Sequence, residues 1–376
     1  MRVQAVALAA IALLTAPASI PAGTAHAEVR IGAAGPITGT NAWYGEQMLL
    51  GVQTAVAELN ARGGVLGQQV RIVEGDDVCD PEQGVAAARK LIGDGVVFVS
   101  GHVCSGAAIP ASAVYEAHDV LDIAPTASNP RLTEQGFTKV FRLVGRDDQQ
   151  GEFAAGFITA RWSGKRIALV HDSQAYGQGL VEQVKLALNA RDVREVALES
   201  VRPGQIDFGP LLARLAEVGA EIVYYGGYPS EAGLLVRQAR MEGHAFQLVS
   251  GDSLYTEQFG LLGGEAAEGV IFSSYPDARH NPEAAEVVAR FRAAGFEPEG
   301  LTLYHYASVQ VWAQAAKKAG TFAGGELAAV LRRERFPTVL GLVGFDAKGD
   351  VTGVAGFAWY VWRGGTYVPL GGPETE

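Results

Sequence analysis

Residues 96–106 read VVFVSGHVCSG and form the clearest strand-to-helix unit of the chain. The apolar, β-branched run at 96–100 predicts a buried strand, and the small polar residues after it predict a turn into a helix over 107–117. Segments of the same kinds lie on either side: strands at 70–73 and 121–124, and a helix at 81–92. This alternation predicts an α/β fold, with a parallel sheet between layers of helices.

The same order extends along the chain in both directions. A strand at 29–34 leads into a helix over 43–61, in which four apolar residues share one face: Leu49, Val52, Val56 and Leu59. Beyond residue 151 the pattern begins again, with strands at 167–170 and 222–225, a helix at 179–190 and another marked by Leu211, Leu215 and Val218. Because 376 residues exceed what one hydrophobic core holds, we expect two doubly wound lobes, each with a parallel sheet.

The first 27 residues have the parts of a secretory signal peptide. Arg2 precedes an apolar run over 3–14, and Ala25-His26-Ala27 forms an A-x-A cleavage pattern. A membrane anchor is the alternative, but the run is shorter than the ~20 apolar residues of a spanning helix and is followed by Pro17 and Pro21. We therefore expect residues 1–27 to be removed and the mature chain to be a soluble periplasmic protein.

Composition and motifs argue against several classes of function. The formal net charge is −11, and the chain has no basic patch with interleaved aromatic residues, so nucleic acid is a poor candidate partner. The chain lacks G-x-S-x-G, a P-loop and H-E-x-x-H, and Gly32 and Gly35 are wrongly spaced for G-x-G-x-x-G. The sequence therefore predicts a protein that is not an enzyme and that holds no cofactor and no metal ion.

Cys79 and Cys104 are the only cysteines of the chain. An even pair in an exported protein favours a disulfide, which would stabilise the fold by ~3 kcal/mol in the chain-entropy treatment. The alternatives are a nucleophilic Cys104 assisted by His102, and a two-cysteine metal site. Only Val103 separates His102 from Cys104, and further metal ligands at useful spacing are lacking.

Small polar residues follow the strands of the first lobe, at the sheet edge where α/β proteins bind ligands. Ser105 follows the strand at 96–100, and the small residues Thr126, Ala127 and Ser128 follow the strand at 121–124. Hydroxyl and backbone N–H groups in such turns can bind a carboxylate without a basic side chain. The alternative is that Ser105 and Ser128 are ordinary helix caps.

The second lobe carries complementary groups after its own strands. Tyr176 follows the strand at 167–170, Tyr228 follows the strand at 222–225, and Asp252 follows Val249-Ser250-Gly251. A carboxylate there can accept an ammonium group, and the tyrosine rings can add cation–π attraction. Opposite charges on opposite walls indicate a zwitterionic ligand. The alternative is that Asp252 caps a helix over 253–259 and that the tyrosines only pack.

Five stretches of the chain form a recognisable set: 44–47 (YGEQ), 76–81 (DDVCDP), 101–105 (GHVCS), 171–177 (HDSQAYG) and 224–228 (YYGGY). Together they resemble the leucine/isoleucine/valine-binding proteins that serve ABC transporters, members of the type I periplasmic solute-binding family. The paired cysteines and the YYGGY run are the most specific of these motifs. The resemblance extends from about residue 29 to about residue 362.

The resemblance implies a role for each polar candidate residue. It implies that an amino acid carboxylate binds to the hydroxyl and backbone groups of Ser105, Thr126, Ala127 and Ser128. It also implies that Asp252 receives the α-ammonium, beside Tyr176 and Tyr228. The resemblance also implies a glutamate in related proteins where this chain has Asp252. Since aspartate is one methylene shorter, the ammonium either lies deeper or is bridged by a water.

The resemblance also implies which residues meet the ligand's side chain. Tyr44 and Leu301 would line the apolar end of the pocket, and Gly106 and Ala107 replace bulkier hydroxyl residues there. A wider apolar pocket would admit leucine, isoleucine and valine. It could also accept phenylalanine or another aromatic or carboxylate solute, which is the alternative for the ligand.

By the same resemblance, the two lobes close around the solute at a three-stranded hinge. The hinge crossings are expected near 145–148, 274–277 and 353–356, so that lobe 1 comprises 28–146 plus 277–354 and lobe 2 comprises 147–276 plus 355–376. The predicted function is capture of an aliphatic or branched-chain amino acid, and its delivery by a monomeric binding protein to the membrane permease subunits of an ABC transporter. A free-standing ligand sensor is the alternative.

Overall fold

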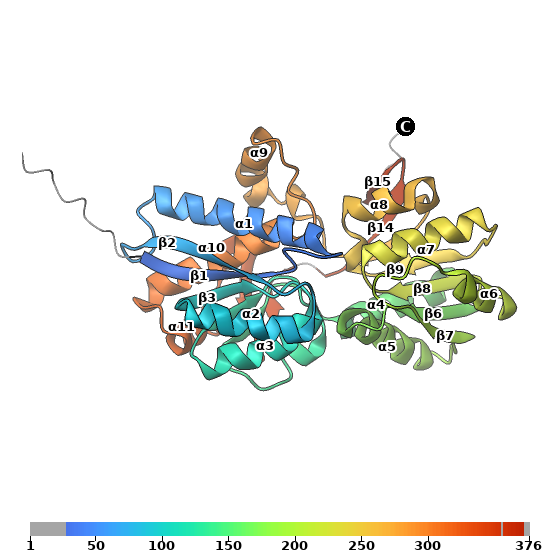
Figure 1. The fold of residues 1–376 in the computed structure, drawn as a ribbon, viewed down its shortest axis with the longest axis horizontal. Helices are drawn as coiled ribbons and strands as arrows, with labels where there is room; N and C mark the ends of the chain where they lie inside the picture. Colours follow the sequence, from blue (N-terminus) through green and yellow to red (C-terminus); the bar gives the residue numbers. More distant parts are fainter. Residues whose placement is uncertain (1–27, 355, 372–376) are drawn as a thin grey trace, which may run out of the picture.

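The computed structural model describes residues 28–354 and 356–371 (Figure 1). The predicted signal peptide, residues 1–27, lies outside the described residues. Two α/β bodies lie side by side along the long axis of the molecule, each built around its own sheet (Figure 1). The structure therefore confirms the predicted fold class, two doubly wound lobes.

The first body contains a five-stranded sheet in the order β2-β1-β3-β4-β5, in which every neighbouring pair is parallel. The strands are β1 (Glu28–Gly35), β2 (Gln69–Asp76), β3 (Val96–Gly101), β4 (Leu121–Ala124) and β5 (Val140–Arg142). β2 is longer than the apolar run that predicted it. It continues through Glu74 to Asp76 because its backbone pairs with β1 over its whole length, whatever the polarity of its side chains.

Helices cover both faces of this sheet (Figure 1). α1 (Ala42–Ala61) packs against α10 (Thr302–Ala319) on one face, and α2 (Pro81–Gly93) packs against α3 (Ser105–Ala117) on the other. The first body also contains α9 (Ala285–Ala293), α11 (Gly324–Leu331) and the short 3-10 helices η1 (Pro130–Leu132), η4 (Ala278–His280) and η5 (Pro282–Ala284). On α1, Val52 and Val56 are buried as the apolar pattern predicts, whereas Leu49 and Leu59 are only half-buried.

The second body contains a seven-stranded sheet in the order β15-β14-β10-β9-β8-β6-β7. Its parallel part consists of β6 (Ile167–His171), β7 (Ala197–Ser200), β8 (Ile222–Gly226), β9 (Gln247–Ser250) and β10 (Ile271–Ser274). Two further strands, β14 (Ala358–Arg363) and β15 (Thr366–Pro369), pair antiparallel at one edge. The sheet is therefore mixed rather than purely parallel, because the Gly364-Gly365 turn folds the end of the chain into a hairpin against β10.

The second body's helices lie on both faces of its sheet (Figure 1). They are α4 (Asp147–Arg161), α5 (Ala175–Asn189), α6 (Gly209–Glu217), α7 (Pro229–Met241), α8 (Glu257–Gly263) and the short η2 (Asp252–Leu254) and η3 (Gly264–Ala267). The expected single helix over 253–259 is instead η2 followed by α8. The break occurs because the side chain of Thr256 caps α8, accepting a hydrogen bond from the backbone N–H of Gln258.

The chain passes between the two bodies after β5, after β10 and after β13 (Val351–Thr352). β13 belongs to a small antiparallel sheet with β11 (Phe336–Thr338) and β12 (Gly341–Phe345). Residue 355, in the third passage, lies outside the described residues. We propose that these passages form the hinge and that the two bodies correspond to lobe 1 and lobe 2 as defined above.

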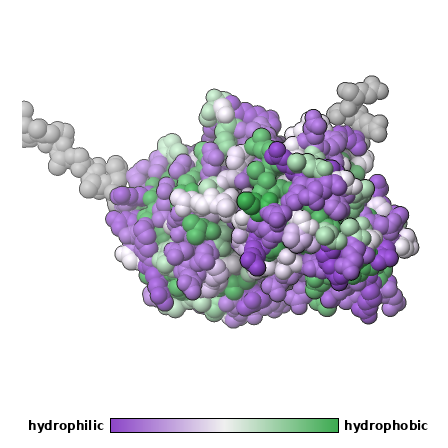
Figure 2. All heavy atoms as spheres, turned by 45° about the vertical axis from the view of Figure 1, so that its right-hand side comes forward, coloured by the Kyte–Doolittle hydropathy of each residue, from purple (hydrophilic) through white to green (hydrophobic). Residues whose placement is uncertain are grey.

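Polar residues cover most of the face shown in Figure 2, and apolar side chains lie among them in small groups. Throughout residues 28–354 and 356–371, no helix has both the length and the apolar character needed to cross a membrane.

Candidate functional site

A pocket lies between the two lobes, beyond the carboxyl ends of the parallel strands. Lobe 1 contributes Tyr44, Val103, Ser105, Thr126 and Leu301, and lobe 2 contributes Tyr176, Tyr228, Asp252, Ser253 and Tyr255. The enclosed cavity volume is only about 30 Å³, compared with about 390 Å³ when the open mouth is included. The lobes are therefore nearly closed on the site.

Direct hydrogen bonds between the lobes support this closed arrangement. The Tyr44 hydroxyl donates to the backbone oxygen of Ser253 (2.7 Å), and the Asn129 side-chain amide donates to the backbone oxygen of Ala175 (2.8 Å). Since these bonds join residues that are far apart in the sequence and lie on different lobes, they can form only when the lobes meet.

The first wall of the pocket is the start of α3. Cys104, not Ser105, is the N-cap residue of this helix, so the prediction that Ser105 caps it is wrong. Ser105 is instead the first helical residue, and its hydroxyl accepts a hydrogen bond from the Asn129 N–H (3.3 Å). The N–H groups of a first helical turn have no partner within the helix, and they carry the positive end of the helix dipole. This wall is suited to binding a carboxylate.

The loop after β4 forms the rest of the same wall. The Thr126 hydroxyl donates to the backbone oxygen of Val103 (3.1 Å), so this side chain already holds the neighbouring loop. Asn129, rather than Ser128, caps η1 by accepting from the Arg131 N–H (3.0 Å). Ala127 and Ser128 do not line the pocket, although both are buried. The pocket lining thus includes the other seven of the nine proposed ligand-binding residues.

The opposite wall carries the negative charge. Asp252 is the first residue of η2, and its Oδ1 accepts a hydrogen bond from the Tyr176 hydroxyl (2.9 Å). The Asp252 side chain lines the pocket and is only partly buried there. Burial raises the pKa of Asp252 to about 6, an effect that the Tyr176 hydroxyl partly opposes. A carboxylate in this environment gains strongly from a cationic partner.

A second carboxyl group lies close to Asp252. Asp147, the first residue of α4, is fully buried, and its N–H donates to the backbone oxygen of Ser128 (3.0 Å). Neither the Asp147 carboxyl nor the Ser128 hydroxyl forms a well-aligned hydrogen bond among the described residues. Burial, followed by the charge of Asp252, raises the pKa of Asp147 to about 8, while the nearby Ser128 hydroxyl lowers it. Asp147 is therefore largely protonated at neutral pH.

Tyrosine rings from both lobes pack against one another at the site. The ring of Tyr228 lies 6.1 Å from that of Tyr44, nearly edge-on, and 5.4 Å from that of Tyr176. The YYGGY run allows this packing because a Cβ at Gly226 would lie 2.5 Å from the backbone oxygen of Gly177 in α5. Together with the aliphatic side chains of Val103 and Leu301, these rings are suited to contact the apolar side chain of a ligand.

Cys79 and Cys104 form the predicted disulfide, with their Cα atoms 5.3 Å apart. The hypothesis of a nucleophilic Cys104 is therefore wrong. His102 is fully buried, with Nδ1 2.6 Å from an Asp77 carboxylate oxygen and Nε2 2.8 Å from the Tyr115 hydroxyl. The disulfide and these side-chain contacts fix the loop that carries Ser105.

Comparisons with known proteins agree with this geometry. A sequence profile of the family described as "Periplasmic binding protein" matches residues 28–366. The chain belongs to this family. One similar relative is the Leu/Ile/Val-binding protein homolog 1 of Brucella melitensis biotype 1, which is 45% identical over 344 residues, 91% of this chain and 92% of the relative.

Two solved structures are similar over 91% of this chain. The leucine binding protein LivK of Thermotoga maritima has a TM-score of 0.83 at 25% identity, with 97% of its chain covered. The branched-chain amino acid transporter substrate binding protein LivJ of Streptococcus pneumoniae, solved in complex with isoleucine, has a TM-score of 0.81 at 26% identity, with 100% covered.

Sequence reasoning missed three residues that line the pocket of this periplasmic binding protein, Val103, Ser253 and Tyr255. It also missed the buried Asp147, whose pKa is affected by the charge of Asp252. Val103 lies within the GHVCS motif, and Ser253 and Tyr255 directly follow Asp252, so their closeness to predicted residues was an available signal. Asp147 offered no such signal. An acidic residue in the first turn of a helix is common on protein surfaces, and only the tertiary structure shows that this one is buried.

Proposed function

We propose that this periplasmic binding protein captures an aliphatic α-amino acid, with leucine, isoleucine and valine as the preferred ligands, and delivers it to the permease subunits of an ABC transporter. One observation carries the proposal: the closed pocket joins a helix N-terminus with hydroxyl groups on lobe 1 to the Asp252 carboxylate on lobe 2. The names and bound isoleucine of similar proteins support the same ligand class.

Each pole of the ligand has its own partner in this proposal. The carboxylate binds at Ser105 and at the loop that contains Thr126 and Ser128, because the α3 N-terminus is positive there. The ammonium binds at Asp252, beside the ring of Tyr176. The aliphatic side chain then lies toward Tyr44 and Leu301, where the pocket is apolar.

Closure follows from the division of these groups between the lobes. A ligand that has docked on lobe 1 gains the contacts with Asp252, Tyr176 and Tyr228 only when lobe 2 swings in. It therefore binds the closed form more tightly than the open form and shifts the population toward it. We propose that the closed, ligand-bound form is the one that the permease receives in the periplasm.

Calorimetry with matched ligands tests the function. L-Leucine, L-isoleucine and L-valine are expected to bind, and each at ~100-fold its Kd should stabilise the protein by about 2.7 kcal/mol in thermal unfolding. Two leucine analogues serve as controls, 4-methylpentanoate without the ammonium and 3-methylbutylamine without the carboxylate. Both should bind far more weakly. Equal affinity for 4-methylpentanoate would reject the ammonium site and favour a carboxylate-only ligand such as benzoate, which belongs in the same panel.

Binding is also expected to depend on pH through Asp252. A bound ammonium stabilises the carboxylate and lowers its pKa from the value of about 6 in the unliganded protein. Below that pH the ligand must displace a proton from Asp252, so affinity for L-leucine should fall by up to ~10-fold for each unit that the pH is lowered. Above that pH, Asp252 should add no pH dependence to the affinity. Calorimetry in two buffers of different ionisation enthalpy measures the released proton. A Kd that stays constant from about pH 5 to about pH 7 would contradict this expectation.

A further inference from the structure

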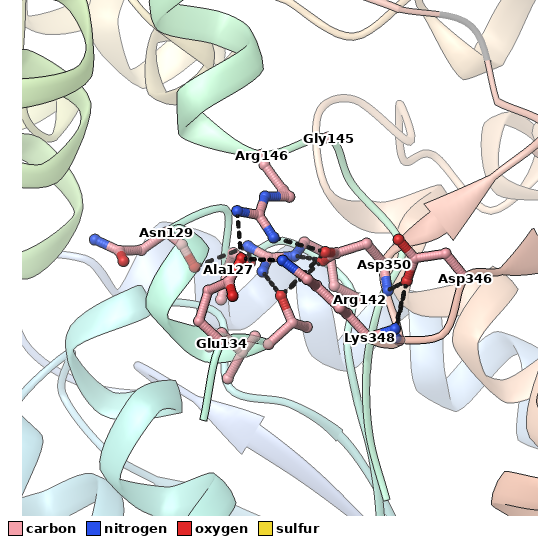
Figure 3. A network of polar contacts seen from close by, with 12 residues as sticks. Ala127, Asn129, Glu134, Arg142, Gly145, Arg146, Asp346, Lys348 and Asp350 are labelled. Atoms are coloured by element: carbon pink, nitrogen blue, oxygen red, sulfur yellow. Dashed lines mark hydrogen bonds and ion pairs between the residues drawn. The ribbon is translucent and has the colours of Figure 1, made fainter. Parts of the chain in front are cut away.

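A network of charged side chains behind the pocket centres on Asp350, the residue just before β13 (Figure 3). Arg142 donates from Nε to Oδ1 of Asp350 (2.8 Å), and Arg146 donates from Nη1 to Oδ2 (2.9 Å). Thr133 donates its hydroxyl to Oδ1 (2.9 Å). One carboxylate, just before the third passage between the lobes, is therefore shared by Arg142 at the end of β5 and Arg146 in the first passage.

Arg142 connects this carboxylate to the ligand-binding loop. Its side chain is fully buried, and Nη1 donates to the backbone oxygens of Ala127 (3.1 Å) and Asn129 (2.9 Å) (Figure 3). These two carbonyl groups flank Ser128. The guanidinium thus fixes the backbone of the loop on which the carboxylate of the ligand is proposed to dock, without touching the ligand itself.

Arg146 connects the same carboxylate to lobe 2. It is the N-cap residue of α4, and its guanidinium donates from Nη2 to Oδ2 of Asp148 (2.8 Å), in the first turn of that helix. The same Nη2 lies 2.8 Å from Glu134 of lobe 1, which also pairs with Lys348 (Figure 3). Only 13% of the Arg146 side chain is exposed. The side chain therefore bridges both lobes at the passage where the chain must bend.

We propose that Asp350, Arg142 and Arg146 form a latch that couples the ligand-binding loop to closure of the lobes. Rotation of lobe 2 changes the backbone at residues 143–147 and carries Arg146 with α4. The bonds from Arg146 to Asp350 and Glu134 fit one orientation of the lobes, the closed one, while Arg142 holds Asp350 in place. Charge-assisted bonds with little exposure are strong enough to shift such an equilibrium.

The three residues are positioning residues, and the proposed coupling to a ligand rests on the proposed function. An uncharged side chain at 146 is expected to leave the pocket lining unchanged but to remove the preference for the closed form. A lower closed population lowers the apparent affinity in proportion, and it speeds release of the ligand.

An Arg146→Gln variant tests the latch. L-Leucine affinity by calorimetry is expected to fall ~10-fold, with faster dissociation in stopped flow, because allosteric couplings of this kind span ~5- to 150-fold. Small-angle scattering of the unliganded variant should give a larger radius of gyration than the wild type. The affinity and the radius of gyration of Arg146→Lys should lie between those of the wild type and of Arg146→Gln, since lysine keeps the charge but not the forked geometry.

Arg214→Gln is the matched control, because Arg214 pairs with Glu217 (2.8 Å) on the exposed surface of lobe 2 alone. It should change neither scattering nor affinity. If Arg146→Gln keeps both the wild-type scattering and an L-leucine Kd within twofold of the wild type, the latch is rejected. If the wild type binds no L-leucine at all, the proposed ligand is rejected, and the scattering comparison of unliganded proteins then decides on the latch by itself.

Discussion

An Asp252→Asn variant is expected to lose L-leucine affinity by a factor of about 30 to several thousand. Removing one member of a desolvated, hydrogen-bonded charge pair costs about 2–5 kcal/mol, and each 1.4 kcal/mol is tenfold in Kd. In this protein the loss should be near the upper end, because Asp252 is the only carboxylate that lines the pocket among the described residues. Isothermal calorimetry at neutral pH measures the change.

The same substitution is expected to stabilise the unliganded protein. Burial raises the pKa of Asp252 to about 6, above the 3.8 of an unperturbed group, so the folded state disfavours its ionised form. The raised pKa therefore adds to the free energy of unfolding at low pH, and this contribution is lost as pH rises from about 4 to about 6. At pH 7 the asparagine variant should therefore be more stable, by at most ~3 kcal/mol because the side chain keeps some exposure, and near pH 4 the difference should vanish.

Two companion variants make this result specific. Asp252→Glu keeps the charge and adds one methylene, so it should bind L-leucine far better than Asp252→Asn. Glu265→Gln removes a charge from an exposed position of lobe 2 and should change neither affinity nor stability. Wild-type affinity in Asp252→Asn would show that the ammonium binds elsewhere. The buried Asp147 would then be the next candidate.

Local sequence patterns predicted the parallel parts of both sheets well. The apolar runs that became β1, β3, β4, β6 and β8 are short, rich in β-branched residues and bounded by turn residues, so each run indicates its own strand. The antiparallel edge formed by β14 and β15 could not be predicted in this way. Its position depends on pairing with β10, about 90 residues earlier in the sequence, after the chain has returned through the hinge.

The candidate site was predictable to the extent that its side chains directly follow strands. Tyr176, Tyr228 and Asp252 come from three different strand ends of one sheet, which parallel topology brings to a common edge. The detailed roles were not predictable. That Thr126 uses its hydroxyl to hold Val103, and that Asp147 is buried beside Asp252, both follow from contacts between segments distant in sequence. Local propensity carries no information about such contacts.

Replacing both cysteines, in a Cys79→Ala/Cys104→Ala variant, is expected to lower the free energy of unfolding by about 3 kcal/mol. The disulfide joins residues 25 positions apart, and closing a loop of that length removes entropy from the unfolded chain. Alanine suits both positions, since each is buried and a serine hydroxyl would have to be desolvated. Urea unfolding measures the loss as a lower midpoint with little change in slope.

The effect of this double variant on L-leucine binding should be much smaller than its effect on stability. Cys79 has a left-handed backbone (φ 63°), a strained conformation for a residue with a Cβ, and its N–H donates to Asp77 (2.8 Å). Without the disulfide this turn should relax. The Ser105 loop, however, remains held by the contacts of His102 with Asp77 and Tyr115. We therefore expect less than a ~10-fold loss of affinity below the unfolding midpoint, and reduced wild-type protein should behave like the variant. Complete loss of binding in a folded variant would show instead that the disulfide itself sets the carboxylate wall.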